Sequence, residues 1–402
     1  MRRRLSLVAI TLGAGAVWLL AASQLWDTTV PEGLRVPDVE SGEHFTEAQL
    51  ARAERYERFL RIDFLLSQVA ALVVLALYAA RGARLMRESA AGRIGTGMLL
   101  GMLGLALLWL ADLPFAAAAQ WWQRRYGVSQ VGYGEWLLQH WLGLGGGFLF
   151  VSLALLIVMG LAGVLRDRWW VAAAPVFVSL AALFAFVYPY LIPDVEPLRD
   201  PELQAEARSM ARDQGIEPVP VKVEEVSGWT TAPNAQATGI GDSSRVILWD
   251  TLLLRFQDDE VEVVLAHELA HVSREHVLRG IGWYALFAVP GTLLFALATR
   301  PRGGLYEPRA VPLALLVLVA LQLAAAPFEN IVSRRYEAEA DWIALETTRD
   351  PDSARGLFEG FTTEALADPS PPWWAHVLLD THPTVLERIE MADAWATRSS
   401  RR

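Results

Sequence analysis

Seven long apolar stretches alternate with three polar blocks along the chain. The apolar stretches are residues 5–23, 62–80, 94–118, 143–165, 170–192, 280–299 and 310–328. The length of each stretch is close to what a helix needs to cross a hydrocarbon core, which is about 20 residues. Trp and Arg side chains flank them, as in an interfacial belt. The pattern predicts an all-α multi-pass membrane protein with these seven spans.

The first stretch has an alternative interpretation as a cleaved signal peptide. Arg2–Arg4 resemble its basic start and Ala21–Ser23 resemble a small-residue cleavage site. Signal peptides usually have an apolar core of about 7–15 residues, and this stretch is longer. A retained span is therefore favoured.

Composition agrees with a membrane protein and excludes several kinds of chemistry. Hydrophobic residues make up 53% of the 402 residues and charged residues only 20%, with a net charge of −10. The acidic balance argues against a nucleic-acid partner. The absence of Cys excludes disulfides, thiolate metal sites and a Cys nucleophile. Lys222 is the one lysine among 35 basic residues, a bias that suggests a GC-rich bacterial genome and hence a bacterial plasma membrane.

The polar blocks are residues 24–61, 193–279 and 329–402. In the second block, 201–215 has the pattern of an amphipathic helix, VPVKVEEV alternates like a strand, and NAQATGIGDSSRVILWD reads as a hairpin turning at Gly241–Ser244. This predicts a small α+β lobe. We expect an N-terminal membrane region, 1–192, with five spans, and a second domain, 193–402, that contains the two spans 280–299 and 310–328.

The sequence VEVVLAHELAHVSREHVL, which begins at Val261, contains an HExxH motif. His267 and His271 are four residues apart, so they lie about 40° apart on one face of a helix and can bind one zinc ion. Glu268 stands beside them, where it can take a proton from zinc-bound water and pass it to the leaving amine. The motif predicts that the domain 193–402 is a zinc metallopeptidase domain.

A catalytic zinc of this kind needs a third protein ligand. In SRRYEAEAD, residues 333–341, Glu337 and Asp341 share one helix face. We assign Glu337 as the ligand and Asp341 as the acceptor that orients a histidine N–H, whereas Glu339 should point elsewhere. Two spans separate His271 from Glu337 and four separate the first two polar blocks, so all three blocks are expected on the same side of the membrane.

The other histidines are not expected to bind this metal. His276 lies nine residues after His267, about 180° around a continuous helix, and is expected to be a hydrogen-bonding residue on the opposite face. His44 and His140 carry no motif and are interpreted as non-functional.

With these motifs, the chain resembles the type I CAAX prenyl protease family of integral-membrane zinc endopeptidases. PNAQATGIGDSSRVILWDTLL is similar to the family's hairpin, and THPTVLERIEMA is similar to its C-terminal Ser-His-Pro-Pro motif. FTEAQLARAERYE and RRYGVSQ are similar to segments of its N-terminal half. The resemblance covers nearly the whole chain.

The resemblance implies a ring of seven helices around a water-filled chamber into which the zinc site opens. It places His267, His271 and Glu337 on the zinc ligands, Glu268 on the catalytic glutamate, and Asn234 on a residue that holds substrate backbone. It also places His382 on a residue that supports the oxyanion, a role suited to a hydrogen-bond donor. The implied partners are the lipid bilayer and peptide or protein substrates, including prenylated ones. The hairpin lacks the aromatics of eukaryotic members, and a bacterial host without prenylated proteins would require another membrane-associated or misfolded substrate.

The loop charges and the family resemblance predict opposite orientations of the chain in the membrane. Arginines of the short loops gather on the side away from the polar blocks: Arg2, Arg3, Arg4, Arg81, Arg84, Arg87, Arg93, Arg166, Arg168, Arg300, Arg302 and Arg309. The positive-inside rule then favours a cytoplasmic N-terminus and a zinc site on the outer face. The family resemblance implies a cytoplasmic active site.

Two other kinds of protein could carry parts of this pattern. A site-2-type intramembrane protease also uses HExxH, but here acidic residues precede the motif and SREH follows it, so the helix is not a span. A catalytically silent scaffold or lipid-binding chamber would be expected to lose a ligand or the glutamate, and the chain keeps all four residues. The zinc metalloendopeptidase is therefore the leading hypothesis.

Overall fold

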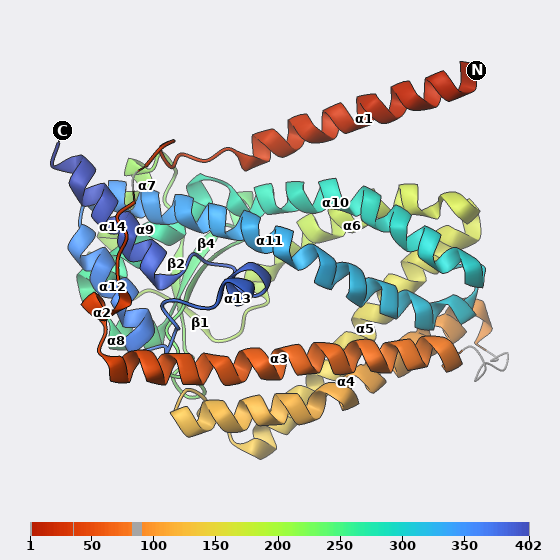
Figure 1. The fold of residues 1–402 in the computed structure, drawn as a ribbon, viewed down its shortest axis with the longest axis horizontal. Coiled ribbons are helices and arrows are strands. Elements are labelled where there is room, and N and C mark those ends of the chain that lie inside the picture. Colours follow the sequence, from red (N-terminus) through yellow and green to blue (C-terminus); the bar gives the residue numbers. More distant parts are fainter. Residues whose placement is uncertain (1, 35, 83–90, 402) are drawn as a thin grey trace.

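The computed structural model describes residues 2–34, 36–82 and 91–401, with residues 2–12 described by their backbone alone. Long helices run side by side, and a small lobe closes one end of them (Figure 1). The N-terminal part contains α1 Arg2–Trp26, α2 Ser41–His44, α3 Glu47–Arg81, α4 Gly92–Tyr126, α5 Tyr133–Leu165 and α6 Trp169–Val187. The lobe and the last two long helices contain β1 Val195–Pro197, α7 Pro201–Asp213, β2 Val221–Glu224, β3 Ala235–Thr238, β4 Arg245–Trp249, α8 Asp250–Arg255, α9 Asp258–Ser273, α10 His276–Thr299, α11 Val311–Thr348, α12 Pro351–Thr363, α13 Trp373–Leu378 and α14 Val385–Ser399.

Helical segments long and apolar enough to cross a membrane match the predicted spans. Among the described residues they are 47–81, 92–126, 133–190, 276–302 and 308–348. The third contains two predicted spans, in α5 and α6, which meet at a turn where Arg166 has a φ of 51°. The remaining prediction, 5–23, lies in α1, where the side chains of residues 5–12 are outside the described part. The chain is an integral membrane protein.

Two of the predicted spans continue into the neighbouring polar blocks as single helices, without a break. The acidic FTEAQLARAERYERFL stretch and the span 62–80 form mostly one helix, α3, which begins at a capping box of Thr46 and Gln49. The span 310–328 and the ExxxD motif likewise share the single helix α11. A helix satisfies its own backbone hydrogen bonds, so it continues unchanged from hydrocarbon into the lobe.

The three polar blocks meet at the lobe, as the span count predicted. Arg61 of α3 pairs with Asp368 at 2.9 Å, and the backbone N–H of Thr29 donates to Glu339 at 2.8 Å. Phe45 joins the buried core of the lobe with Leu248 and Leu265. At the other end of the long helices, Arg93 and Arg166 both lie over the ring of Tyr306, so three arginine-bearing loops share that end. Arg84 and Arg87 are outside the described residues.

The sheet of the lobe has the order β1-β2-β4-β3. The predicted hairpin is present: β3 and β4 are antiparallel, and β2 lies parallel to β4 on the other side. The turn requires Gly239, whose φ is +89° and whose added Cβ would lie 2.3 Å from the Ser243 carbonyl oxygen. β3 is thus an edge strand, and it packs against α9, as β4 also does.

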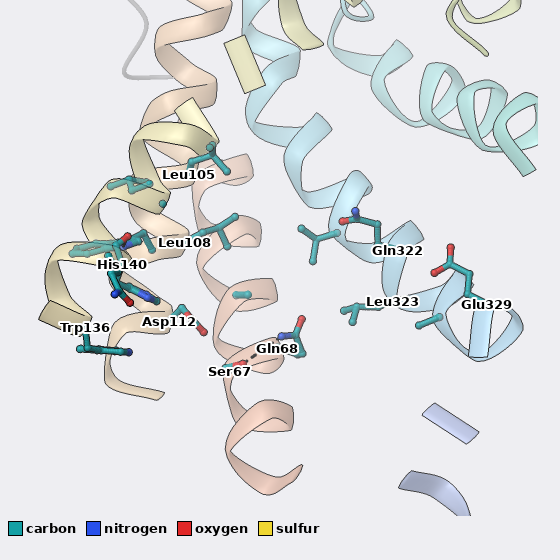
Figure 2. Close-up of a pocket in the computed structure, with 18 residues that line it drawn as sticks. Ser67, Gln68, Leu105, Leu108, Asp112, Trp136, His140, Gln322, Leu323 and Glu329 are labelled. Atoms are coloured by element: carbon teal, nitrogen blue, oxygen red, sulfur yellow. Dashed lines mark hydrogen bonds between the residues drawn. The ribbon is translucent and has the colours of Figure 1, made fainter. Parts of the chain in front are cut away.

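A cavity of about 990 Å³ opens between α3, α4, α5 and α11, in the region where the family resemblance predicted a chamber. Figure 2 shows its walls, with Gln68 and Asp112 facing Gln322 and Glu329 across the space. His140 lies on the wall formed by α5, stacked on Trp136. Polar and ionisable side chains at membrane depth are costly unless they face water or one another, and here several of them face a shared cavity.

Candidate metal centre

Helix α9 carries the HExxH motif through the middle of the lobe. It begins at Asp258, where the Glu260 carboxylate accepts from the Gln257 backbone N–H at 2.9 Å. Its apolar side chains, including Val261, Leu265 and Leu269, belong to the lobe core. This packing on several sides fixes the rotation of the helix, and so fixes where its two motif histidines point.

His267, His271 and Glu337 converge as a group that can hold a metal ion. One ligand atom from each lies within 4.8 Å of the other two. The His267 Nε2 atom is 3.1 Å from both His271 Nε2 and Glu337 Oε2, and His271 Nε2 is 3.6 Å from Glu337 Oε1. Two imidazole nitrogens and a carboxylate oxygen form a donor set suited to zinc. The donors thus fit the expected metal in both chemistry and mutual distance.

Asp341 and Arg388 support His267 on the side of the ring away from the metal group. The Asp341 Oδ1 atom lies 2.8 Å from His267 Nδ1, and Arg388 binds both oxygens of that carboxylate, with N–O distances of 2.8 and 2.6 Å. Burial disfavours the charged imidazole, but the hydrogen bonds to Asp341 and Glu337 outweigh burial and raise the pKa of His267 to about 10. The arrangement orients the ring and favours its Nδ1–H form toward Asp341.

Arg388 was not assigned a role from the sequence, although a signal was present. It lies on α14 three residues after Val385 and one before Ile389, both buried. A charged side chain among core positions of an amphipathic helix requires a buried partner. Here that partner is Asp341, and the guanidinium also lies 4.4 Å from the centre of the Phe358 ring.

The prediction for His276 was wrong about its position. Helix α9 ends at Ser273, and Glu275 adopts a left-handed conformation with a φ of 53° before α10 begins at His276. This break turns the chain back, and His276 Nδ1 lies 2.9 Å from His271 Nδ1. The angle of about 180° assumed a continuous helix. His276 is a hydrogen-bonding residue, but on the metal side.

The remaining candidate residues surround a small cleft beside the metal group. The cleft has a volume of about 90 Å³, and Asn234, Glu268, Asp341 and His382 line it together with His267. Glu268 is buried, with 7% of its surface exposed. His382 lies on the loop before α14, with its side chain 58% exposed and its Nε2 atom 3.2 Å from Glu337 Oε2.

Two other residues lie away from this group. His44 pairs with Glu359 at 2.6 Å, between α2 and α12. Glu339 points away from the three metal-group residues, as expected, but it is fully buried rather than solvated.

Residues 197–396 match the protein-family model described as peptidase family M48. The metal group and the cleft both lie inside this range. A relative from Bacillus subtilis, named as an uncharacterized metalloprotease YhfN, is 25% identical over 91% of this chain and 91% of its own length.

Other relatives and one solved structure agree with this match. A CAAX prenyl protease 1 homolog of Taenia solium is 22% identical over 60% of this chain, and a protease HtpX homolog of Campylobacter concisus is 31% identical over 39%. The chain spans 62% of each of these two proteins. The crystal structure of S. mikatae Ste24p has the same fold, with a TM-score of 0.75 at 18% identity, covering 94% of this chain and 97% of that one. Residues 197–396 therefore form a domain of the peptidase family M48 type, and the chain is an integral-membrane metalloendopeptidase.

Proposed function

We propose that the lobe hydrolyses peptide bonds with one zinc ion held by His267, His271 and Glu337. The observation that carries this proposal is the convergence of their three ligand atoms within 4.8 Å beside the buried Glu268. When bound, zinc would polarise the scissile carbonyl and lower the pKa of a water molecule. The same ligands also accept cobalt or manganese, so zinc is the proposed resident metal rather than the only possible one.

Glu268 is the proposed general base and acid. It follows His267 directly on α9 and lines the cleft, so its carboxylate can take a proton from the attacking water and deliver it to the leaving amine. Asp341 is the proposed acceptor for the Nδ1 proton of His267, at 2.8 Å, so that Nε2 is the ring atom that would bind the metal.

Asn234 and His382 are the proposed substrate contacts. Among the described strands, β3 pairs only with β4, so its outer edge offers backbone N–H and C=O groups to an extended peptide. Asn234 directly precedes this strand. The exposed His382 faces Glu337 from the open side of the cleft, where its N–H could donate to the oxyanion that develops during hydrolysis.

The proposed substrates are C-terminal segments of membrane-associated proteins, with prenylated CAAX segments as the specific case. Two kinds of observation support this: the cavity between the spans, and the names of the Taenia solium relative and the Ste24p structure. A general role in cleaving membrane proteins is the broader form of the proposal. A site-2-type protease is disfavoured because α9 is packed in the lobe core and is not among the membrane-spanning helices.

A peptide-cleavage assay tests this proposal. Detergent-purified protein is given a quenched fluorescent peptide with or without a farnesylated cysteine, beside Glu268→Gln and a chelator control. We expect chelator-sensitive cleavage that the variant loses, and faster cleavage of the farnesylated peptide. Equal cleavage of both peptides would overturn the prenyl preference, and cleavage that survives in Glu268→Gln would overturn the role of Glu268.

A further inference from the structure

A second buried polar cluster lies directly behind the metal group. Its centre is the carboxylate of Glu339, which is fully buried. One oxygen accepts from Arg274 Nε and from the Thr29 backbone N–H, both at 2.8 Å. The other oxygen lies 3.0 Å from His276 Nε2 and 3.3 Å from Arg279 Nη1. A buried carboxylate with this many donors is held in one position and stays ionised.

His276 connects this carboxylate to the metal group. Both of its ring nitrogens are engaged, Nδ1 with His271 Nδ1 at 2.9 Å and Nε2 with Glu339 at 3.0 Å. The ring is held further by stacking on Tyr336, at 4.5 Å between ring centres and 6° between planes. His276 is therefore fixed by contacts on two edges and one face.

Only one arrangement of protons satisfies all of these contacts when His271 binds a metal through Nε2. The proton of His271 must then lie on Nδ1, which donates to Nδ1 of His276. The proton of His276 must lie on Nε2, which donates to the Glu339 carboxylate. Metal-binding histidines commonly donate their second N–H to such a partner, which fixes the ring and raises its basicity.

We propose that His276 and Glu339 are positioning residues for His271. The inference rests on the proposed role of His271 as a metal ligand. The two metal-binding histidines would then be oriented by two carboxylates of the same helix, α11. Asp341 contacts His267 directly, whereas Glu339 acts on His271 through the ring of His276.

Two substitutions of His276 separate positioning from packing. His276→Phe keeps an aromatic ring against Tyr336 but removes both nitrogens. His276→Gln loses the ring, yet its amide oxygen can accept from His271 and its amide N–H can donate to Glu339. Zinc affinity of the purified full chain is measured by competition with a chelator, without any peptide substrate. We expect a 10-fold to 100-fold rise in Kd for His276→Phe, in line with the usual effect of outer-shell partners, and a smaller rise for His276→Gln.

A second pair of variants on α11 covers the case in which His276→Phe does not fold. Glu339→Gln should raise the Kd for zinc, because the neutral amide is a weaker acceptor for His276 than a carboxylate. Glu346→Gln is the matched control, since Glu346 accepts from Trp395 at 3.2 Å, seven residues further along the helix. We expect Glu346→Gln to leave the Kd unchanged.

Equal zinc Kd values for wild type and His276→Phe, or for wild type and Glu339→Gln, would overturn the positioning role. A larger loss in His276→Gln than in His276→Phe would do the same, because it would indicate that packing matters more than hydrogen bonding. His271→Ala distinguishes this from failure of the proposed function. If wild type and His271→Ala bind zinc equally, or neither binds it, the proposed metal site itself is wrong.

Discussion

Replacing Asp341 by asparagine separates the stability of the lobe from its capacity to bind metal. In the structure the Asp341 carboxylate has two tasks: it neutralises Arg388 and it accepts from His267 Nδ1. The side chains of Asp341 and Arg388 are only 2% and 10% exposed. Removing one partner of a buried ion pair typically costs about 3–5 kcal/mol, because the other charge is left without compensation. We expect a loss of this size in the free energy of unfolding of the metal-free protein.

The second task predicts a separate loss in metal affinity. Removing an outer-shell acceptor weakens metal binding about 10-fold to 100-fold. The double variant Asp341→Asn/Arg388→Met removes the unpaired cation as well, so it should recover much of the stability. It should not recover the affinity for zinc, because the acceptor for His267 is still neutral.

Denaturation of the metal-free chain in detergent and chelator competition measure the two effects. Asp393→Asn is the control, because Asp393 pairs with Arg355 near the surface, where both side chains are more than a quarter exposed. Such a pair contributes about 0–1 kcal/mol. Unchanged zinc affinity in Asp341→Asn, or affinity restored in the double variant, would refute the reasoning.

Three further predictions concern pH, the hairpin and orientation. The pKa of His267 is raised from 6.5 to about 10. Its contribution to the stability of the chelator-treated protein is therefore fully present below pH 6.5 and is lost as pH rises toward 10. The prediction is contradicted if the unfolding midpoints of wild type and His267→Gln depend on pH in the same way in this window. Gly239→Ala should lower the unfolding temperature far more than Gly241→Ala, because an added Cβ at Gly239 meets the Ser243 carbonyl at 2.3 Å while the space beside Gly241 is open; equal losses would show that positive φ alone decides. If the positive-inside rule holds, a reporter that is active only outside the cytoplasm should be active when fused after Arg402. Activity of a cytoplasm-only reporter at the same position would show that the zinc site faces the cytoplasm instead.

The sequence predicted those features that depend on short-range periodicity. Apolar stretches of about 20 residues identified the spans, because a helix is one of the few structures that satisfies all of its backbone hydrogen bonds in hydrocarbon. The HExxH spacing identified His267 and His271 as a pair on one helix face, and the turn residues Gly241–Ser244 identified the β3–β4 hairpin.

Features that depend on a single backbone turn were not predictable in this way. The left-handed Glu275, a non-glycine residue in a region that L-residues rarely adopt, reverses the expected position of His276. The burial of Glu339 depends on donors from two distant parts of the chain, Thr29, which lies 310 residues away in sequence, and the segment 274–279. Periodicity within one helix carries no information about such contacts.

The most direct test of the account is the metal itself. The full chain is purified with zinc, its metal content is measured per chain, and the zinc is located by anomalous diffraction at the zinc absorption edge. The account predicts one zinc per chain, contacted by Nε2 of His267, Nε2 of His271 and the Glu337 carboxylate, and its loss together with peptide cleavage when Glu337 is replaced by alanine. Zinc bound elsewhere, or peptide cleavage that persists in Glu337→Ala with no metal bound, would contradict it.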